Sequence, residues 1–63
     1  MSTGANIRFY RRKAGMTQWQ LSQAVKIRPG AMLLIERGQR ECPKALLREI
    51  AKALGVSESE LRG

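Results

Sequence analysis

The ionisable side chains of this sequence are mostly cations, and they indicate anion binding rather than catalysis. Twelve Lys and Arg residues oppose five acidic residues, which gives a formal net charge of +7. Every acidic residue lies at Glu36 or later, so the first 35 residues carry only positive charge. A small domain with such a one-sided field suits a polyanion such as nucleic acid. A basic surface that only keeps the protein in solution stays open as the alternative.

Other kinds of chemistry are excluded by composition. The sequence has no His, and Cys42 is its only cysteine, so neither a disulfide framework nor a Cys/His metal site is expected. No two carboxylates are placed for acid–base catalysis, and no Gly-rich loop follows a strand. We therefore predict no enzymatic activity, no cofactor and no small-molecule ligand. The sequence also lacks a signal peptide and a run of apolar residues long enough to span a bilayer, which predicts a cytoplasmic protein.

The segment 16–38 has the pattern of two short helices joined by a tight turn. Thr17 and Gln20 have the spacing of a capping box, which begins a helix. Pro29 suits the first turn of the second helix, because its missing amide hydrogen is not needed there. Gly38 ends that helix. Two helices of this length cannot bury their apolar sides alone, so they need the rest of the chain.

The remaining chain supplies three more helices and no strand. Apolar residues recur at helical spacing on both sides of the segment, and no run alternates at period two. We predict an all-α, five-helix bundle that forms a single domain over residues 1–63, with residues 1–5 frayed. The predicted helices span residues 6–14, 17–25, 29–37, 43–54 and 57–62.

The hydrophobic core is predicted from the side of each helix that carries the apolar stripe. Its members come from all five predicted helices and the turns between them: Ile7, Tyr10, Met16, Leu21, Val25, Ile27, Met32, Ile35, Leu47, Ile50, Leu54, Val56 and Leu61.

The chain resembles the Cro and phage-repressor (XRE-type) helix-turn-helix family over residues 6–61. The resemblance depends on three stretches and one leucine: Gly15-Met16-Thr17-Gln18, Leu21, Ile35-Glu36-Arg37-Gly38 and Ile50-Ala51-Lys52-Ala53-Leu54-Gly55-Val56. It implies five helices, binding to double-stranded operator DNA as a homodimer, and a third helix that lies in the major groove. The expected function is that of a sequence-preferring transcriptional regulator, a repressor that occupies its operator.

The resemblance also implies which residues read the bases. The family's reading positions fall on Arg28, Pro29, Gly30 and Leu34. Arg28 is the one good hydrogen-bond donor among them, and Leu34 offers only a methyl contact to thymine. We assign base readout to Arg28, Gly30 and Leu34, and expect it to be thin, with a large share for shape and phosphate contacts.

A second set of residues is expected at the DNA backbone. By the resemblance, Arg11 pairs with Glu36, which joins the first helix to the end of the third and turns Arg11 toward a phosphate. The alternative is two solvated charges of little energetic value. The full set of expected phosphate contacts is Arg11, Thr17, Gln18, Arg37, Gln39, Arg40 and Lys44.

Two positions depart from the family pattern. Lys26 stands at the turn where the family usually has Gly, and a left-handed conformation there costs a non-Gly residue about 1 kcal/mol. Arg28 stands where the family usually has a Ser or Thr cap, and its side chain cannot accept the amide hydrogen bond that a cap receives.

The apolar residues near the motif leave a second function open. We expect Trp19 to support the core by packing over a helix edge, with contact to DNA sugars or a partner as the alternative. Leu33 and Leu34 adjoin the inward Met32 and Ile35, so a narrow stripe cannot bury all four. An exposed pair indicates either groove contact or a protein-binding surface formed with Trp19.

Overall fold

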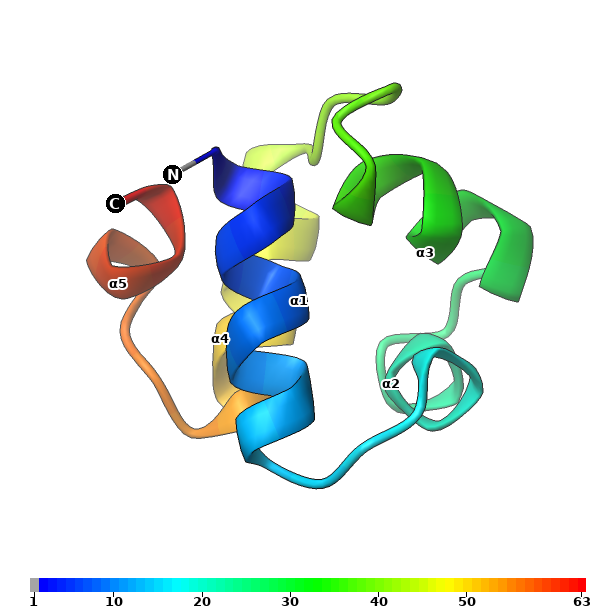
Figure 1. The fold of residues 1–63 in the computed structure, drawn as a ribbon, viewed down its shortest axis with the longest axis horizontal. Helices are drawn as coiled ribbons and strands as arrows, with labels where there is room; N and C mark the ends of the chain where they lie inside the picture. The colour runs from blue at the N-terminus through cyan, green and yellow to red at the C-terminus, as the bar shows by residue number, and fades with distance from the viewer. Residues whose placement is uncertain (1) are drawn as a thin grey trace.

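The fold consists of five helices, as predicted. The computed structural model describes residues 2–63, and the helices are α1 (Thr3–Lys13), α2 (Gln18–Ala24), α3 (Pro29–Glu36), α4 (Lys44–Leu54) and α5 (Glu58–Arg62). In Figure 1, α1 crosses in front of α4, with α5 on one side and α2 and α3 on the other. No strand occurs in residues 2–63. The all-α prediction is confirmed, and every predicted helix end except the start of α1 is within one residue.

The start of α1 corrects the expectation that the first five residues are frayed. Ser2 is the N-cap, and its hydroxyl accepts a hydrogen bond from the amide of Ala5 at 3.2 Å. The helix therefore begins three residues before the predicted Asn6. Met1 lies outside the described residues. The early start of α1 has its cause in the tertiary structure. Gly4 is buried, and an added Cβ there would lie 2.8 Å from the carbonyl oxygen of Glu36. The first turn of α1 thus packs directly on the backbone at the end of α3.

The core prediction is confirmed. Eight of the thirteen predicted residues are buried, and the other five pack against them from partly exposed positions. Two polar residues that the core prediction did not include are also buried. Asn6 donates from Nδ2 to the carbonyl oxygen of Leu61 at 2.9 Å, and Ser22 donates from Oγ to the carbonyl oxygen of Trp19 at 2.7 Å. Each buried donor is therefore satisfied, and Asn6 joins α1 to α5.

The turn between α2 and α3 carries the strain that its sequence predicts. Lys26 has φ of 60°, and it is the only non-glycine residue with positive φ in the described chain. Its amide donates to the carbonyl oxygen of Gln23, and the amide of Ile27 donates to that of Ser22, so the turn is held by backbone bonds. A side chain in this conformation costs about 1 kcal/mol relative to glycine.

We expect Lys26→Gly to raise the stability of the domain. The gain should approach about 1 kcal/mol, reduced by the greater freedom of glycine in the unfolded chain. For a domain of this size it corresponds to a rise in Tm of a few degrees, about 4–8 °C per kcal/mol. Lys26→Ala is the matched control: it removes the same charge but keeps the Cβ, so it should bring no such gain. An equal rise in Tm for both variants would show that charge, not strain, limits stability here.

Candidate nucleic-acid interface

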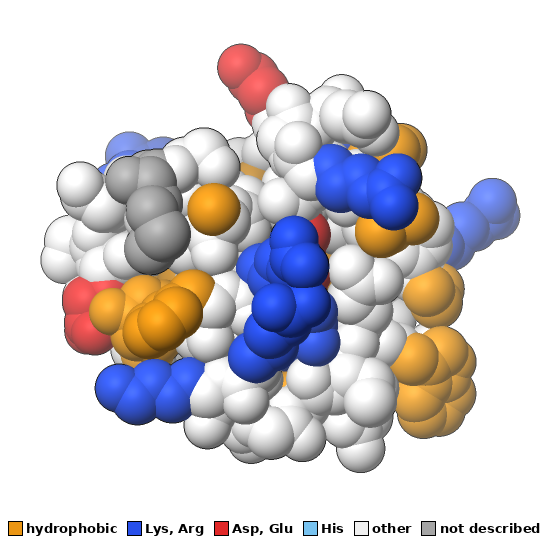
Figure 2. All heavy atoms as spheres, viewed as in Figure 1, with side chains coloured by type: hydrophobic (Ala, Val, Ile, Leu, Met, Phe, Trp, Pro, Cys, Tyr) orange, Lys and Arg blue, Asp and Glu red, His pale blue; other side chains and the backbone are white. Residues whose placement is uncertain are grey.

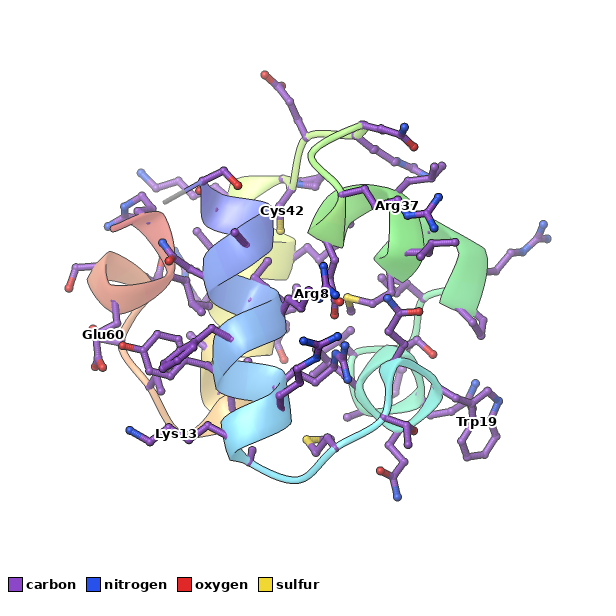
Figure 3. The ribbon with its side chains drawn as sticks, in the orientation of Figure 1. Arg8, Lys13, Trp19, Arg37, Cys42 and Glu60 are labelled. Carbon is purple, nitrogen blue, oxygen red and sulfur yellow. The ribbon has the colours of Figure 1, made fainter. Side chains whose placement is uncertain are left out.

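A basic pocket lies where α1, α2 and α3 face one another. It has a volume of about 420 Å³, and the residues that line it are Arg8, Arg11, Arg12, Thr17, Gln18, Leu33, Glu36 and Arg37. Figure 2 shows Lys and Arg side chains gathered over the middle of this face, with an acidic side chain beneath them. In Figure 3, Arg8 and Arg37 come to this region from α1 and from the end of α3. Four arginines against one buried carboxylate give the pocket a net positive charge, which favours an anionic partner.

The floor of the pocket is the Arg11–Glu36 ion pair that the resemblance implies. Nε of Arg11 lies 2.7 Å from Oε2 of Glu36, and Nη2 donates to Oε1 at 3.1 Å, a bidentate geometry. The Arg11 side chain is 10% exposed and that of Glu36 is 1% exposed. The alternative of two solvated charges is therefore wrong.

The same geometry engages most of the Arg11 guanidinium inside the protein, and its contact with a phosphate stays a prediction. Its Nη1 donates to the carbonyl oxygen of Met16 at 2.8 Å, so all three of its nitrogens are engaged inside the protein. The buried guanidinium joins α1 to the loop before α2 and to α3. Arg11 therefore positions the helices, and it also lines the basic pocket beside Arg8, Arg12 and Arg37.

Gln18 gives the buried carboxylate its third hydrogen bond. Its Nε2 donates to Oε1 of Glu36 at 3.1 Å. Thr17, one residue earlier, is the exposed N-cap of α2 and completes the predicted capping box with Gln20. Both residues line the basic pocket, as does Arg37. With Arg11, the fold thus brings four of the expected phosphate contacts together at one site.

The other three expected phosphate contacts lie apart from this pocket. Gln39, Arg40 and Lys44 are exposed on the connection from α3 to the first turn of α4. Arg40 and Lys44 line a separate hollow of about 640 Å³ next to the start of α1. The structure therefore divides the predicted phosphate contacts into two groups, one at the basic pocket and one at the connection from α3 to α4.

Two arginines of the basic pocket were not assigned a role from sequence. Arg8 and Arg12 are exposed and four residues apart, which places them on one side of α1 beside the buried Arg11. The i, i+4 spacing was a usable signal. The spacing alone does not show that this side of α1 faces α3, because the position of α1 relative to α3 depends on tertiary packing.

The outer side of α3 is almost entirely apolar. Gly30, Leu33, Leu34 and Arg37 follow the spacing i, i+3, i+4, i+7, and we call these four residues the outer stripe. Leu34 is 38% exposed, Leu33 is half-buried at the rim of the basic pocket, and Gly30 has open space around it. Arg28 is exposed just before the helix and makes no capping bond, in agreement with its departure from the family pattern.

Trp19 does not support the core. Its side chain is 61% exposed and extends away from the molecule at α2 in Figure 3, so that expectation is wrong. Leu33 lines the basic pocket and Trp19 does not, so the two residues do not share that pocket. Phe9, which sequence reasoning left out, is 49% exposed on α1 and packs edge-on against Tyr10 with ring centroids 5.1 Å apart.

Cys42 is half-buried after α3, and its thiol donates weakly to the carbonyl oxygen of Pro43 at 3.7 Å. Burial raises the pKa of the Cys42 thiol, which lowers the fraction of reactive thiolate at neutral pH. Within residues 2–63, no group of three or more His, Cys, Asp or Glu side chains could hold a metal ion. Nor does any helix of the described chain have the length and hydrophobicity of a membrane span.

Comparisons with known proteins place the fold in a family. A family model described as a helix-turn-helix domain matches residues 3–62. Two crystal structures of the clp gene regulator ClgR from Corynebacterium glutamicum are 34% identical to the chain, cover 94% of it and superpose with TM-scores of 0.91 and 0.89. The chain spans 63% of the first ClgR chain, which is less than two thirds of its length, and 77% of the second.

A third solved structure is more distant in sequence and similar in fold. It is the restriction-modification controller protein C.AhdI from Aeromonas hydrophila, which is 27% identical over 94% of this chain and 89% of its own, with a TM-score of 0.89. A search of curated proteins gave no significant match.

The chain belongs to the helix-turn-helix family, so the resemblance predicted from its sequence is confirmed. It is a DNA-binding domain of the kind found in transcription regulators. In this family α2 and α3 form the motif, and the second helix of the motif enters the major groove.

Proposed function

We propose that this protein is a sequence-preferring regulator of transcription, a repressor that acts by occupying operator DNA. The basic pocket carries the proposal. It holds Arg8, Arg12 and Arg37 beside α3, where the phosphates that flank a major groove would lie when α3 enters it. In this proposal base contacts come from Arg28, Gly30 and Leu34. Further phosphate contacts come from Arg11, Thr17, Gln18, Gln39, Arg40 and Lys44.

A homodimer on DNA is part of the same proposal. Helix-turn-helix proteins commonly bind two half-sites about one helical turn apart, and the symmetry of the operator matches that of the dimer. Catalysis plays no part, since occupying the operator is enough to exclude other proteins from it.

The salt dependence of binding tests the proposal. We expect log K for a duplex to fall linearly with log salt between about 50 and 200 mM, with a slope of about −0.9 per phosphate neutralised. Removing two cations of the basic pocket with Arg8→Gln/Arg12→Gln should reduce the steepness by about one to two. The measurement is a titration of labelled duplex followed by fluorescence anisotropy.

The chain offers a matched control on α4. Arg48 and Lys52 are also four residues apart and exposed. Each lies near a glutamate, and neither lines the basic pocket. Arg48→Gln/Lys52→Gln therefore changes the net charge by the same amount without touching the pocket, and its salt slope should stay near that of the wild type. No binding to any duplex at about 50 mM salt would favour the other candidate, a protein-binding scaffold that uses Leu33, Leu34 and Trp19.

A further inference from the structure

Helix α3 presents no hydrogen-bonding side chain to the outside. Seven of its eight residues have apolar side chains or none, and Glu36 is the exception. Glu36 is 5% exposed, and both of its carboxylate oxygens are occupied by Arg11 and Gln18. Within the span of α3, therefore, no side chain can form the polar contacts that distinguish most base edges.

Cations surround this apolar surface. Arg28 precedes α3, Arg37 ends the outer stripe, and Leu33 shares the basic pocket with Arg8 and Arg12. These four arginines are all exposed. An apolar surface surrounded by cations suits a polyanion that carries apolar groups in its groove. It suits the apolar face of an ordinary protein less well.

The major groove offers one apolar group, the C5-methyl of thymine. 5-Methylcytosine carries a methyl on the same ring carbon, so it presents the same apolar surface in a C·G pair. Gly30 has open space where a side chain would be, which lets the groove approach the helix closely enough for Leu34 to reach such a methyl.

We propose that the outer stripe of α3 reads C5-methyl groups, so that thymine and 5-methylcytosine are preferred over uracil and cytosine at the positions facing Leu33 and Leu34. The inference rests on the proposed function, because it requires α3 to lie in the major groove. Burying one methyl group contributes about 0.8 kcal/mol, which corresponds to about a fourfold change in Kd. Arg28 has a separate role in the proposal, because an arginine suits the O6 and N7 atoms of guanine.

The test begins with a selection of bound sites from a random duplex pool. In the best site, each thymine is replaced singly by deoxyuridine, which removes only the methyl and keeps the base pairing. We expect about a fourfold loss of affinity at one or two positions of each half-site and no change elsewhere. A C·G pair placed at a sensitive position should then bind about fourfold more tightly with 5-methylcytosine than with cytosine.

Two variants assign the effect to α3. Leu34→Ala changes an exposed side chain, so the fold should be retained, and the thymine-to-uracil ratio of Kd values should fall toward one. Leu33→Ala tests the other leucine in the same way. Phe9→Ala is the control, because it removes a similarly exposed apolar side chain from α1 and should leave the ratio unchanged.

The outcomes separate this inference from the function on which it rests. Three results, each with salt-dependent duplex binding kept, would overturn the methyl-reading role alone. In the first, the thymine-to-uracil ratio of Kd values is near one at every thymine; in the second, the selection enriches no thymine. In the third, that ratio is unchanged in both leucine variants. Failure to bind any duplex would overturn the proposed function as well. Loss of the ratio in either leucine variant, with duplex binding kept, supports the inference.

Discussion

Glu36→Gln is expected to lower the free energy of unfolding by about 3–5 kcal/mol, the usual cost of breaking a buried ion pair. Its carboxylate accepts from Arg11 of α1 and Gln18 of α2 while it stands at the end of α3. The amide nitrogen of Gln would face donors instead, which leaves the Arg11 charge buried without a counterion. The measurement is denaturant unfolding at neutral pH, read as a lower midpoint at unchanged m.

A second glutamate provides the matched control for this prediction. Glu49 forms an exposed pair with Lys52, with side chains 56% and 71% exposed, so Glu49→Gln should change the midpoint little. A double-mutant cycle over Arg11→Met and Glu36→Leu should show strong coupling, with the double variant costing less than the sum of the single ones. Additive effects at the two positions would mean that the pair contributes no specific interaction.

The same substitution should weaken duplex binding where the domain still folds. Gln18 and the arginines of the basic pocket are arranged on helices that the Arg11–Glu36 pair holds together. Titration of Glu36→Gln at a temperature well below its own Tm would test this. Wild-type affinity in a folded variant would show that the pair stabilises the fold without positioning the interface.

Gly4→Ala is expected to destabilise the domain by about 1–3 kcal/mol, the range for overpacking a tight contact. The direction is the opposite of helix propensity, which favours alanine over glycine in a helix by about 1 kcal/mol. A Cβ at Gly4 would collide with the carbonyl oxygen of Ile35 and lie 2.8 Å from that of Glu36. Both are backbone atoms at the end of α3, so relief requires α1 and α3 to move apart.

Gly30→Ala is the control, since Gly30 is also helical but has no neighbouring atom within 4 Å of the place that a Cβ would take. It should leave stability unchanged or raise it by up to about 1 kcal/mol. The two variants are compared by thermal unfolding under one set of conditions. If Gly4→Ala were as stable as Gly30→Ala, the close approach of α1 to α3 would be wrong.

The sequence by itself determined the helices and the core, because both depend on local periodicity. Apolar residues at spacings of three and four assign a buried side to each helix without knowledge of its neighbours, and caps such as Thr17 and Ser57 are recognised within four residues. The strained turn at Lys26 was expected from the resemblance, because the family usually has Gly at that position. The start of α1 was not, because Gly4 belongs to the helix through its close contact with the end of α3.

The candidate site depended on the tertiary structure. The resemblance supplied the pairing of Arg11 with Glu36, but only the packed helices show that the pair is buried and that Gln18 joins it. Burial commits most of the Arg11 guanidinium to partners inside the protein, and the packing of α1 against α3 brings Arg8 and Arg12 to the pocket with Arg37. Residue type and spacing determine local conformation. How exposed a side chain is, and which residues of other helices it contacts, depend on how the helices pack.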